Sequence, residues 1–119
     1  MYLLIWVMEL IDLGDYVGLR VKEEMISRGL SGKDLANSTY ELLGFKSPIS
    51  ARDYIRSVRE GCFHVGPKCT KSMRLKRLSE MLSFFNLTEN DEIILKIKLE
   101  YPEFKYHLNN NYSIYSEKS

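Results

Sequence analysis

A short polar stretch in the middle of the chain, SARDYIRSVREG, carries three arginines at the spacing of one helical face. Arg52, Arg56 and Arg59 lie at offsets of four and seven residues, which places them on one side of a helix. A guanidinium group donates paired hydrogen bonds to phosphate, to carboxylate or to the edge of guanine. This helix has two alternative interpretations. Either its polar face contacts a negatively charged partner, or it is a solvated edge on which the arginines pair with Asp53 or Glu60.

The positive charge of the chain is concentrated around these arginines. The whole sequence has a net charge of only +1, but residues 50–77 contain eight Lys or Arg against two Asp or Glu, a net of +6. The flanking segments 1–49 and 78–119 have net charges of −2 and −3. Such segregation favours local attraction of phosphate or of another acidic surface.

Other chemistry is weakly indicated. Cys62, His64 and Cys69 are competent zinc ligands, but C-x-H-x4-C is not a standard spacing, a structural zinc takes four ligands, and His107 is far away in sequence. Redox sensing by the two cysteines is a further alternative. The sequence has no glycine-rich phosphate loop, no paired carboxylates in an apolar setting and no nucleophile matched to its histidines. We therefore predict neither an enzyme nor a bound metal or cofactor.

The composition predicts one globular domain. The chain has 119 residues, of which 45% are apolar and 28% charged. Two cysteines make no disulfide framework, and no signal peptide is evident, so we expect a cytoplasmic protein. The apolar start, residues 1–14, is shorter than the roughly 20 residues that span a bilayer and is expected to pack as an extension. A start at Met8 is an alternative. The predicted divisions are this extension, a domain over 15–98 and a tail over 99–119.

Periodicity and capping signals predict the helices that hold the arginines in place. Ser31 with Asp34, and Ser50 with Asp53, form S-x-x-D capping patterns at helix starts. Ile49 is expected to pack on Tyr54 as a hydrophobic staple. The helices are predicted over Asp15–Arg28, Ser31–Leu43, Ala51–Glu60 and Lys71–Phe85.

Residues 91–101 fit two patterns. Thr88 and Asp91 suggest a helix start, which favours a helix through about Lys98, but strict apolar alternation from Ile93 to Tyr101 also fits a half-buried strand. Both readings stay open at this point.

Three segments together resemble the lambda-repressor-like helix-turn-helix family, which includes phage Cro and repressor proteins and many small bacterial regulators. They are GLSGKDLA at 29–36, SARDYIRSVREG at 50–61 and LKRLSEMLSFFNLTENDEI at 75–93. The resemblance covers roughly 15–97. It implies an all-α, compact five-helix domain, followed by a short C-terminal strand or tail. Two connections, 37–49 and 62–72, are longer than is usual in the family.

The resemblance also implies a function: a sequence-specific regulator, of phage or bacterial repressor type, that binds double-stranded DNA as a homodimer on a two-fold site. The helix Ala51–Glu60 would be the recognition helix in the major groove. A small helical protein-interaction module, such as an antitoxin or a phage-encoded inhibitor, is the alternative. The residues implied to contact bases are Arg52, Asp53, Arg56 and Ser57. The residues implied to contact phosphates are Ser31, Lys33, Arg59, Lys68, Lys71, Arg74, Lys76 and Arg77.

Overall fold

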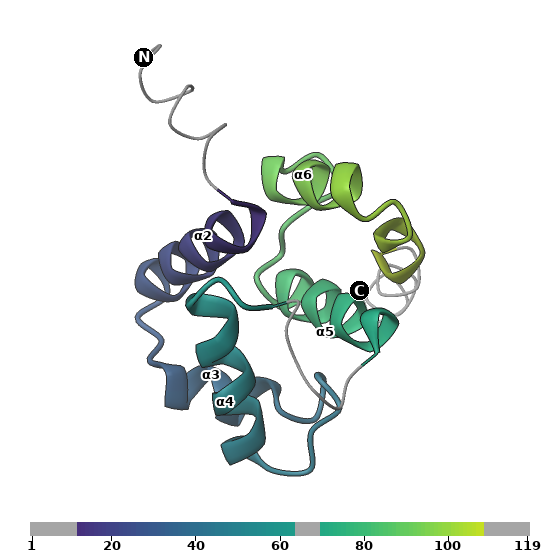
Figure 1. The fold of residues 1–119 in the computed structure, drawn as a ribbon. Helices are drawn as coiled ribbons and strands as arrows, with labels where there is room; N and C mark the ends of the chain where they lie inside the picture. The colour runs from purple at the N-terminus through teal and green to yellow at the C-terminus, as the bar shows by residue number, and fades with distance from the viewer. Residues whose placement is uncertain (1–11, 64–69, 109–119) are drawn as a thin grey trace.

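The computed structural model describes residues 12–63 and 70–108, and over these residues the chain is all-helical (Figure 1). This confirms the predicted all-α class for the described part of the chain, which contains no strand. Residues 1–11, most of the predicted apolar extension, lie outside the described residues, and so does Lys68. The helices are α2 (Leu13–Ser27), α3 (Gly32–Thr39), α4 (Pro48–Arg59), α5 (Lys71–Phe84) and α6 (Glu92–Glu100).

Helix α3 begins at the predicted capping box. The amide of Asp34 donates to Ser31 Oγ and the amide of Ser31 donates to Asp34 Oδ2, each at 3.1 Å. The helix ends at Thr39, four residues before the predicted end at Leu43. Its last three residues are Asn, Ser and Thr, which are weak helix formers, and the chain continues through turns that bury Leu43.

Helix α4 begins earlier than predicted. Its N-cap is Ser47 rather than Ser50, and Pro48 occupies the first turn, where a missing N–H costs nothing. The amide of Ser50 donates to Ser47 Oγ at 3.4 Å. Ile49 is 75% exposed, so the predicted staple between Ile49 and Tyr54 does not form. The helix ends as predicted before Gly61, whose φ of +87° favours glycine.

Within residues 91–101 the chain forms helix α6, so the strand alternative is wrong. The N-cap of α6 is Asp91 rather than Thr88, and the amide of Ile93 donates to Asp91 Oδ1 at 3.0 Å. Ile93, Ile94 and Ile97 are buried on one helical face, whereas Leu95 is 47% and Leu99 84% exposed. The apolar alternation therefore reflects two faces of a helix.

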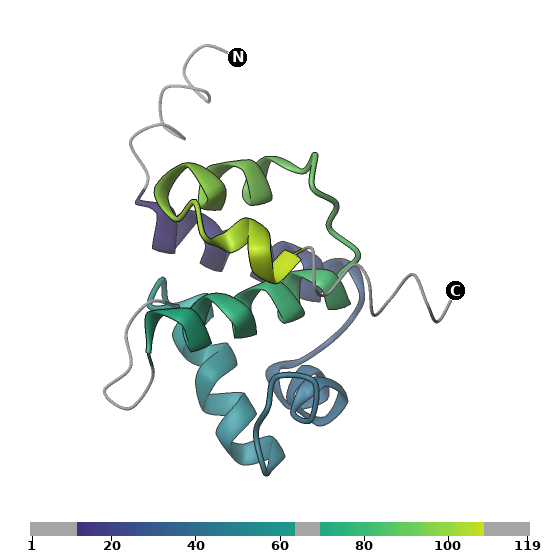
Figure 2. The same cartoon turned by 90° about the vertical axis from the view of Figure 1, so that its right-hand side faces the viewer.

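The helices are arranged around one core. Helices α3 and α4 pack together at one end of the molecule, α6 lies at the other end, and α5 lies between them (Figures 1 and 2). Helix α2 contacts both α4 and α6. No helix in the described ranges is long and apolar enough to cross a membrane.

The packed body extends past the boundary predicted at residue 98. Phe104 and Leu108 are buried in the same core as the helices, and this segment lies beside α5 (Figure 2). Lys71 of α5 forms an ion pair of 2.8 Å with Glu103. The segment 99–108 therefore belongs to the domain rather than to a tail.

Candidate nucleic-acid interface

The outward face of α4 carries the predicted base-contacting arginines. Arg52, Asp53 and Arg56 are exposed, while Ala51, Ile55 and Val58 on the opposite face are fully buried. The fourth predicted residue, Ser57, is half-buried, and its hydroxyl donates to the Asp53 carbonyl at 3.1 Å. Its oxygen can still accept a hydrogen bond. The structure thus places all four side chains on one short helix, three of them exposed.

Arg52 and Arg56 have no ion pair and no side-chain hydrogen bond among residues 12–63 and 70–108. The alternative in which they pair with Asp53 or Glu60 is therefore not realised in the described structure. Two guanidinium groups four residues apart remain available to an external acceptor. Arginine in this arrangement suits guanine or phosphate equally well.

A close backbone contact with α2 fixes the end of α4. A Cβ on Gly18 would lie 2.8 Å from the carbonyl oxygens of both Val58 and Arg59, and a Cβ on Gly14 would overlap the Gly61 carbonyl. Only glycine permits this approach. The role of these two glycines was not predicted, although their G-x-x-x-G spacing in α2 is compatible with close helix packing.

The long connection between α3 and α4 is held by Arg77. Its Nε donates to the Leu43 carbonyl at 3.1 Å, and its guanidinium lies 4.2 Å from the centroid of the Phe45 ring. The Phe45 ring lies 5.7 Å from that of Tyr54 in α4. Arg77 was predicted to contact phosphate. The structure instead gives it partners within the chain, so it links α5 to the connection that precedes α4.

The start of α3 holds two more predicted phosphate contacts. The hydroxyl of Ser31 accepts the Asp34 amide, so the capping box already uses it. Hydrogen bonding from the Ser31 backbone, and then its side chain, lowers the pKa of the Asp34 carboxyl, which places a fixed negative charge here. Lys33 is exposed and has no ion pair in the described part of the chain. Of the two, Lys33 is the better phosphate ligand.

The cations of α5 that were predicted to contact phosphates differ in whether they already have partners within the chain. Lys71 pairs with Glu103, which raises the pKa of its ammonium, and lies 5.1 Å from the centroid of the Tyr101 ring. Arg74 is half-buried and has a partner within the chain. Lys76 is exposed. The predicted phosphate set is therefore not one uniform surface, and Lys76 is the exposed cation of α5 that forms no ion pair with a described residue.

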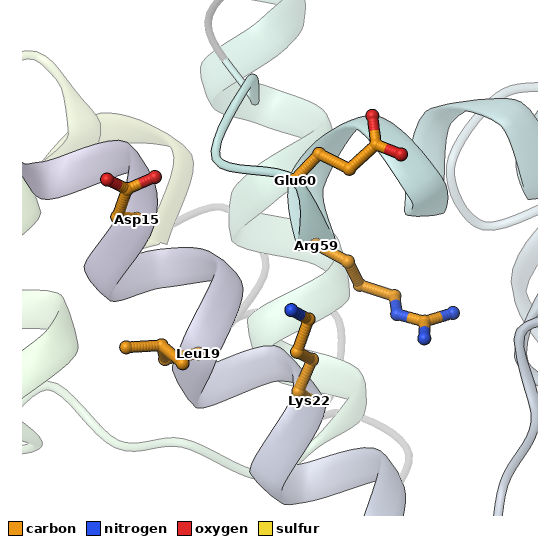
Figure 3. Close-up of a pocket in the computed structure, with 5 residues that line it drawn as sticks. All are labelled: Asp15, Leu19, Lys22, Arg59 and Glu60. Carbon is orange, nitrogen blue, oxygen red and sulfur yellow. The ribbon is translucent and has the colours of Figure 1, made fainter.

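The last predicted cation of α4, Arg59, does not share the exposure of Arg52 and Arg56, and its guanidinium lies near Gly32 at the start of α3. It is half-buried and lines a hollow of about 420 Å³ together with Asp15, Leu19, Lys22 and Glu60. Figure 3 shows Lys22 reaching from α2 toward the end of α4. This hollow was not predicted from the sequence.

Of the three possible zinc ligands, only Cys62 lies within the described residues. It is an exposed free thiol, while His64 and Cys69 lie outside. No group of three metal-ligating side chains occurs within 12–63 and 70–108.

Comparison with known proteins assigns neither a family nor a function to the chain. No family model matches the sequence, and no curated protein or solved structure matches it significantly.

Proposed function

We propose that this protein is a sequence-specific DNA-binding regulator that places α4 in the major groove. The observation that carries the proposal is the pair of exposed arginines, Arg52 and Arg56, which have no partner in the described part of the chain. They lie on the outward face of a helix that α2, α3 and the Arg77 contact hold in position. The resemblance to lambda-repressor-like proteins supports it, because that family uses the corresponding helix to bind DNA.

The proposed roles follow from the chemistry of each side chain. Arg52 and Arg56 donate to guanine O6 and N7, each contact contributing about 1–3 kcal/mol of discrimination. Asp53 accepts from cytosine N4, and Ser57, whose hydroxyl hydrogen is donated to the Asp53 carbonyl, accepts at a base edge. Lys33 and Lys76 contact phosphates and add affinity without sequence preference. Arg77 and Lys71 have internal partners and are left out of this set.

We also propose that two copies bind a two-fold site, with half-sites about one helical turn apart. The exposed leucines of α6, Leu95 and Leu99, lie one helical turn apart and suit a self-complementary apolar contact.

The test is selection of bound duplexes from a random pool, followed by affinity measurements. One sequence family with two-fold symmetry should be enriched, and its affinity should fall steeply as salt rises from about 50 to about 200 mM. Arg52→Ala should remove the preference for the selected sequence and leave weak nonspecific binding. Lys105→Ala, which removes an exposed cation outside α3, α4 and α5, is the matched control and should change neither.

Absence of any enriched duplex would contradict the proposal and favour the protein-interaction alternative. Enrichment with wild-type behaviour of Arg52→Ala would retain DNA binding but contradict the role of α4.

A further inference from the structure

Two adjacent hollows lie where α2 passes the end of α4. The first, of about 420 Å³, is the one in Figure 3, and the second has a volume of about 290 Å³. Lys22 and Arg59 line both, so we treat them as one surface and call it the Arg59 groove. Its second half is lined by three apolar side chains of α2 and the following turn, Met25, Ile26 and Leu30, and by Ser31 and Gly32 at the start of α3.

The cations of the Arg59 groove have no acceptor within the described chain. The Nε of Arg59 is closed off from solvent and has no hydrogen-bond partner among residues 12–63 and 70–108. Neither Arg59 nor Lys22 forms an ion pair with a described residue, although Asp15 and Glu60 line the same hollow. A half-buried guanidinium that forms no ion pair within the described chain is suited to an external carboxylate or phosphate.

The walls of the groove are apolar and accessible. Leu19, Lys22 and Ile26 follow each other at helical spacing on the outward face of α2. Ile26 is 79% exposed and Leu19 is 48% exposed. A cation between two exposed aliphatic side chains is complementary to a carboxylate between aliphatic side chains.

These features favour a peptide over a nucleic acid. Duplex DNA carries one negative charge about every 1.7 Å of its axis, so Asp15 and Glu60 would repel it along the first hollow. The apolar walls of the second hollow suit aliphatic side chains, which a nucleic-acid backbone does not offer. A peptide segment can present a single carboxylate with aliphatic neighbours. A basic residue of the same peptide can face Asp15 and Glu60.

We infer that the Arg59 groove binds a segment of another protein in which an acidic residue lies beside aliphatic residues. The surface is distinct from the outward face of α4, so the inference does not depend on DNA binding. A regulator with both surfaces would contact DNA and a protein partner at the same time.

The test uses random peptides about twelve residues long, displayed on phage and panned against the full chain. Enriched peptides should share an Asp or Glu next to aliphatic residues. Binding of a synthetic enriched peptide should weaken by about tenfold or more in Arg59→Gln and in Ile26→Asp. Replacing the acidic residue of the peptide by its amide should have the same effect. Arg52→Ala removes an exposed cation outside the groove and should leave the affinity unchanged.

Ile26 is so exposed that its substitution does not endanger the fold, which keeps the test valid if Arg59→Gln unfolds. Failure to enrich any peptide, enrichment of peptides without an acidic residue, or full binding by Ile26→Asp would each overturn the inference. So would an equal loss of duplex affinity in Arg59→Gln and Arg52→Ala, because the groove would then belong to the DNA surface. Loss of self-association in Ile26→Asp would assign the groove to a second copy of the chain.

Discussion

Lys76 and Arg77 are neighbours in α5, but their side chains have different surroundings. Lys76 is exposed, whereas Arg77 donates to the Leu43 carbonyl and stacks on Phe45. Each contact between a lysine and a phosphate releases counterions from the DNA. Lys76→Ala removes one such contact, so the slope of log affinity against log salt should become less steep by about one. Its effect on stability should stay within about 0.5 kcal/mol.

Arg77→Ala should show the converse pattern. Loss of the hydrogen bond and of the ring contact should lower the free energy of unfolding by about 1–3 kcal/mol and leave the salt slope unchanged. Urea unfolding and duplex titrations at several salt concentrations measure both quantities for the two variants. A reduced salt slope in Arg77→Ala would show that its guanidinium contacts phosphate after all.

His107 gives the domain a pH-dependent stability. Burial, and secondarily the nearby Lys76, lowers the pKa of His107 below its ordinary value of 6.5, while Glu103 opposes the shift. The folded state therefore binds this proton less readily than the unfolded state. The part of the free energy of unfolding that depends on neutral His107 is complete above pH 6.5, and it is lost as pH falls through the lowered pKa.

His107→Gln should remove this part of the acid destabilisation. Urea unfolding of the wild type and of the variant across the range from pH 8 to pH 5 provides the comparison, because this range brackets the ordinary histidine pKa of about 6.5. Parallel stability curves for the two proteins would contradict the assignment.

At the scale of elements, the crossing of α2 and α4 depends on Gly18. Gly18→Ala would place a Cβ 2.8 Å from two backbone carbonyl oxygens, which cannot move as a flexible side chain can. We expect α4 to shift and the free energy of unfolding to fall by about 1–3 kcal/mol. The duplex affinity should fall with it, because Arg52 and Arg56 move with the helix.

Gly32→Ala is the matched control for Gly18→Ala. Its Cβ would lie 3.3 Å from Arg59 Nη1, the far end of a flexible side chain. Urea unfolding should show little loss or a small gain for Gly32→Ala, since alanine is the better helix former. Equal destabilisation of the two variants would mean that close packing on α4 is not the cause.

Features of the helices that depend on nearby residues were predictable from the sequence. The Ser31–Asp34 capping box is correct because both partners lie within one turn. The start of α4 was predicted three residues too late because Ser50 with Asp53 fits a capping pattern, whereas Ser47 is the N-cap and Pro48 occupies the first turn. The end of α3 was overestimated because the burial of Leu43 comes from a turn and not from a continued helix.

The candidate site was predictable to the same extent. Helical periodicity alone predicts that Arg52 and Arg56 lie on the same face of α4, and the structure shows both exposed. The internal partners of Arg77 and Lys71 lie far away in the chain, as the separation of 34 residues between Arg77 and Leu43 shows. No local pattern indicates such contacts, so basic residues on α5 looked alike in the sequence.

At the scale of the whole molecule, self-association should depend on α6. Leu99 is 84% exposed, and a lysine there would place a charge in any apolar contact between copies. Leu99→Lys should therefore be monomeric and should bind a two-fold duplex more weakly than a wild-type dimer. Sedimentation at several protein concentrations measures the change. Ile26→Lys, with a similarly exposed side chain on α2, is the control and should behave as wild type.

The contact of Gly14 and Gly18 with the end of α4 has a consequence for how new specificities can arise. Backbone atoms, and not the outward side chains, set the distance between α2 and α4. The residues that would read a sequence can therefore change without altering the scaffold. A library randomised at Arg52, Asp53 and Arg56 should consist mostly of folded members whose urea midpoints cluster near that of the wild type. Such a chain would be a ready starting point for divergence toward new binding sites, in evolution or by selection in the laboratory.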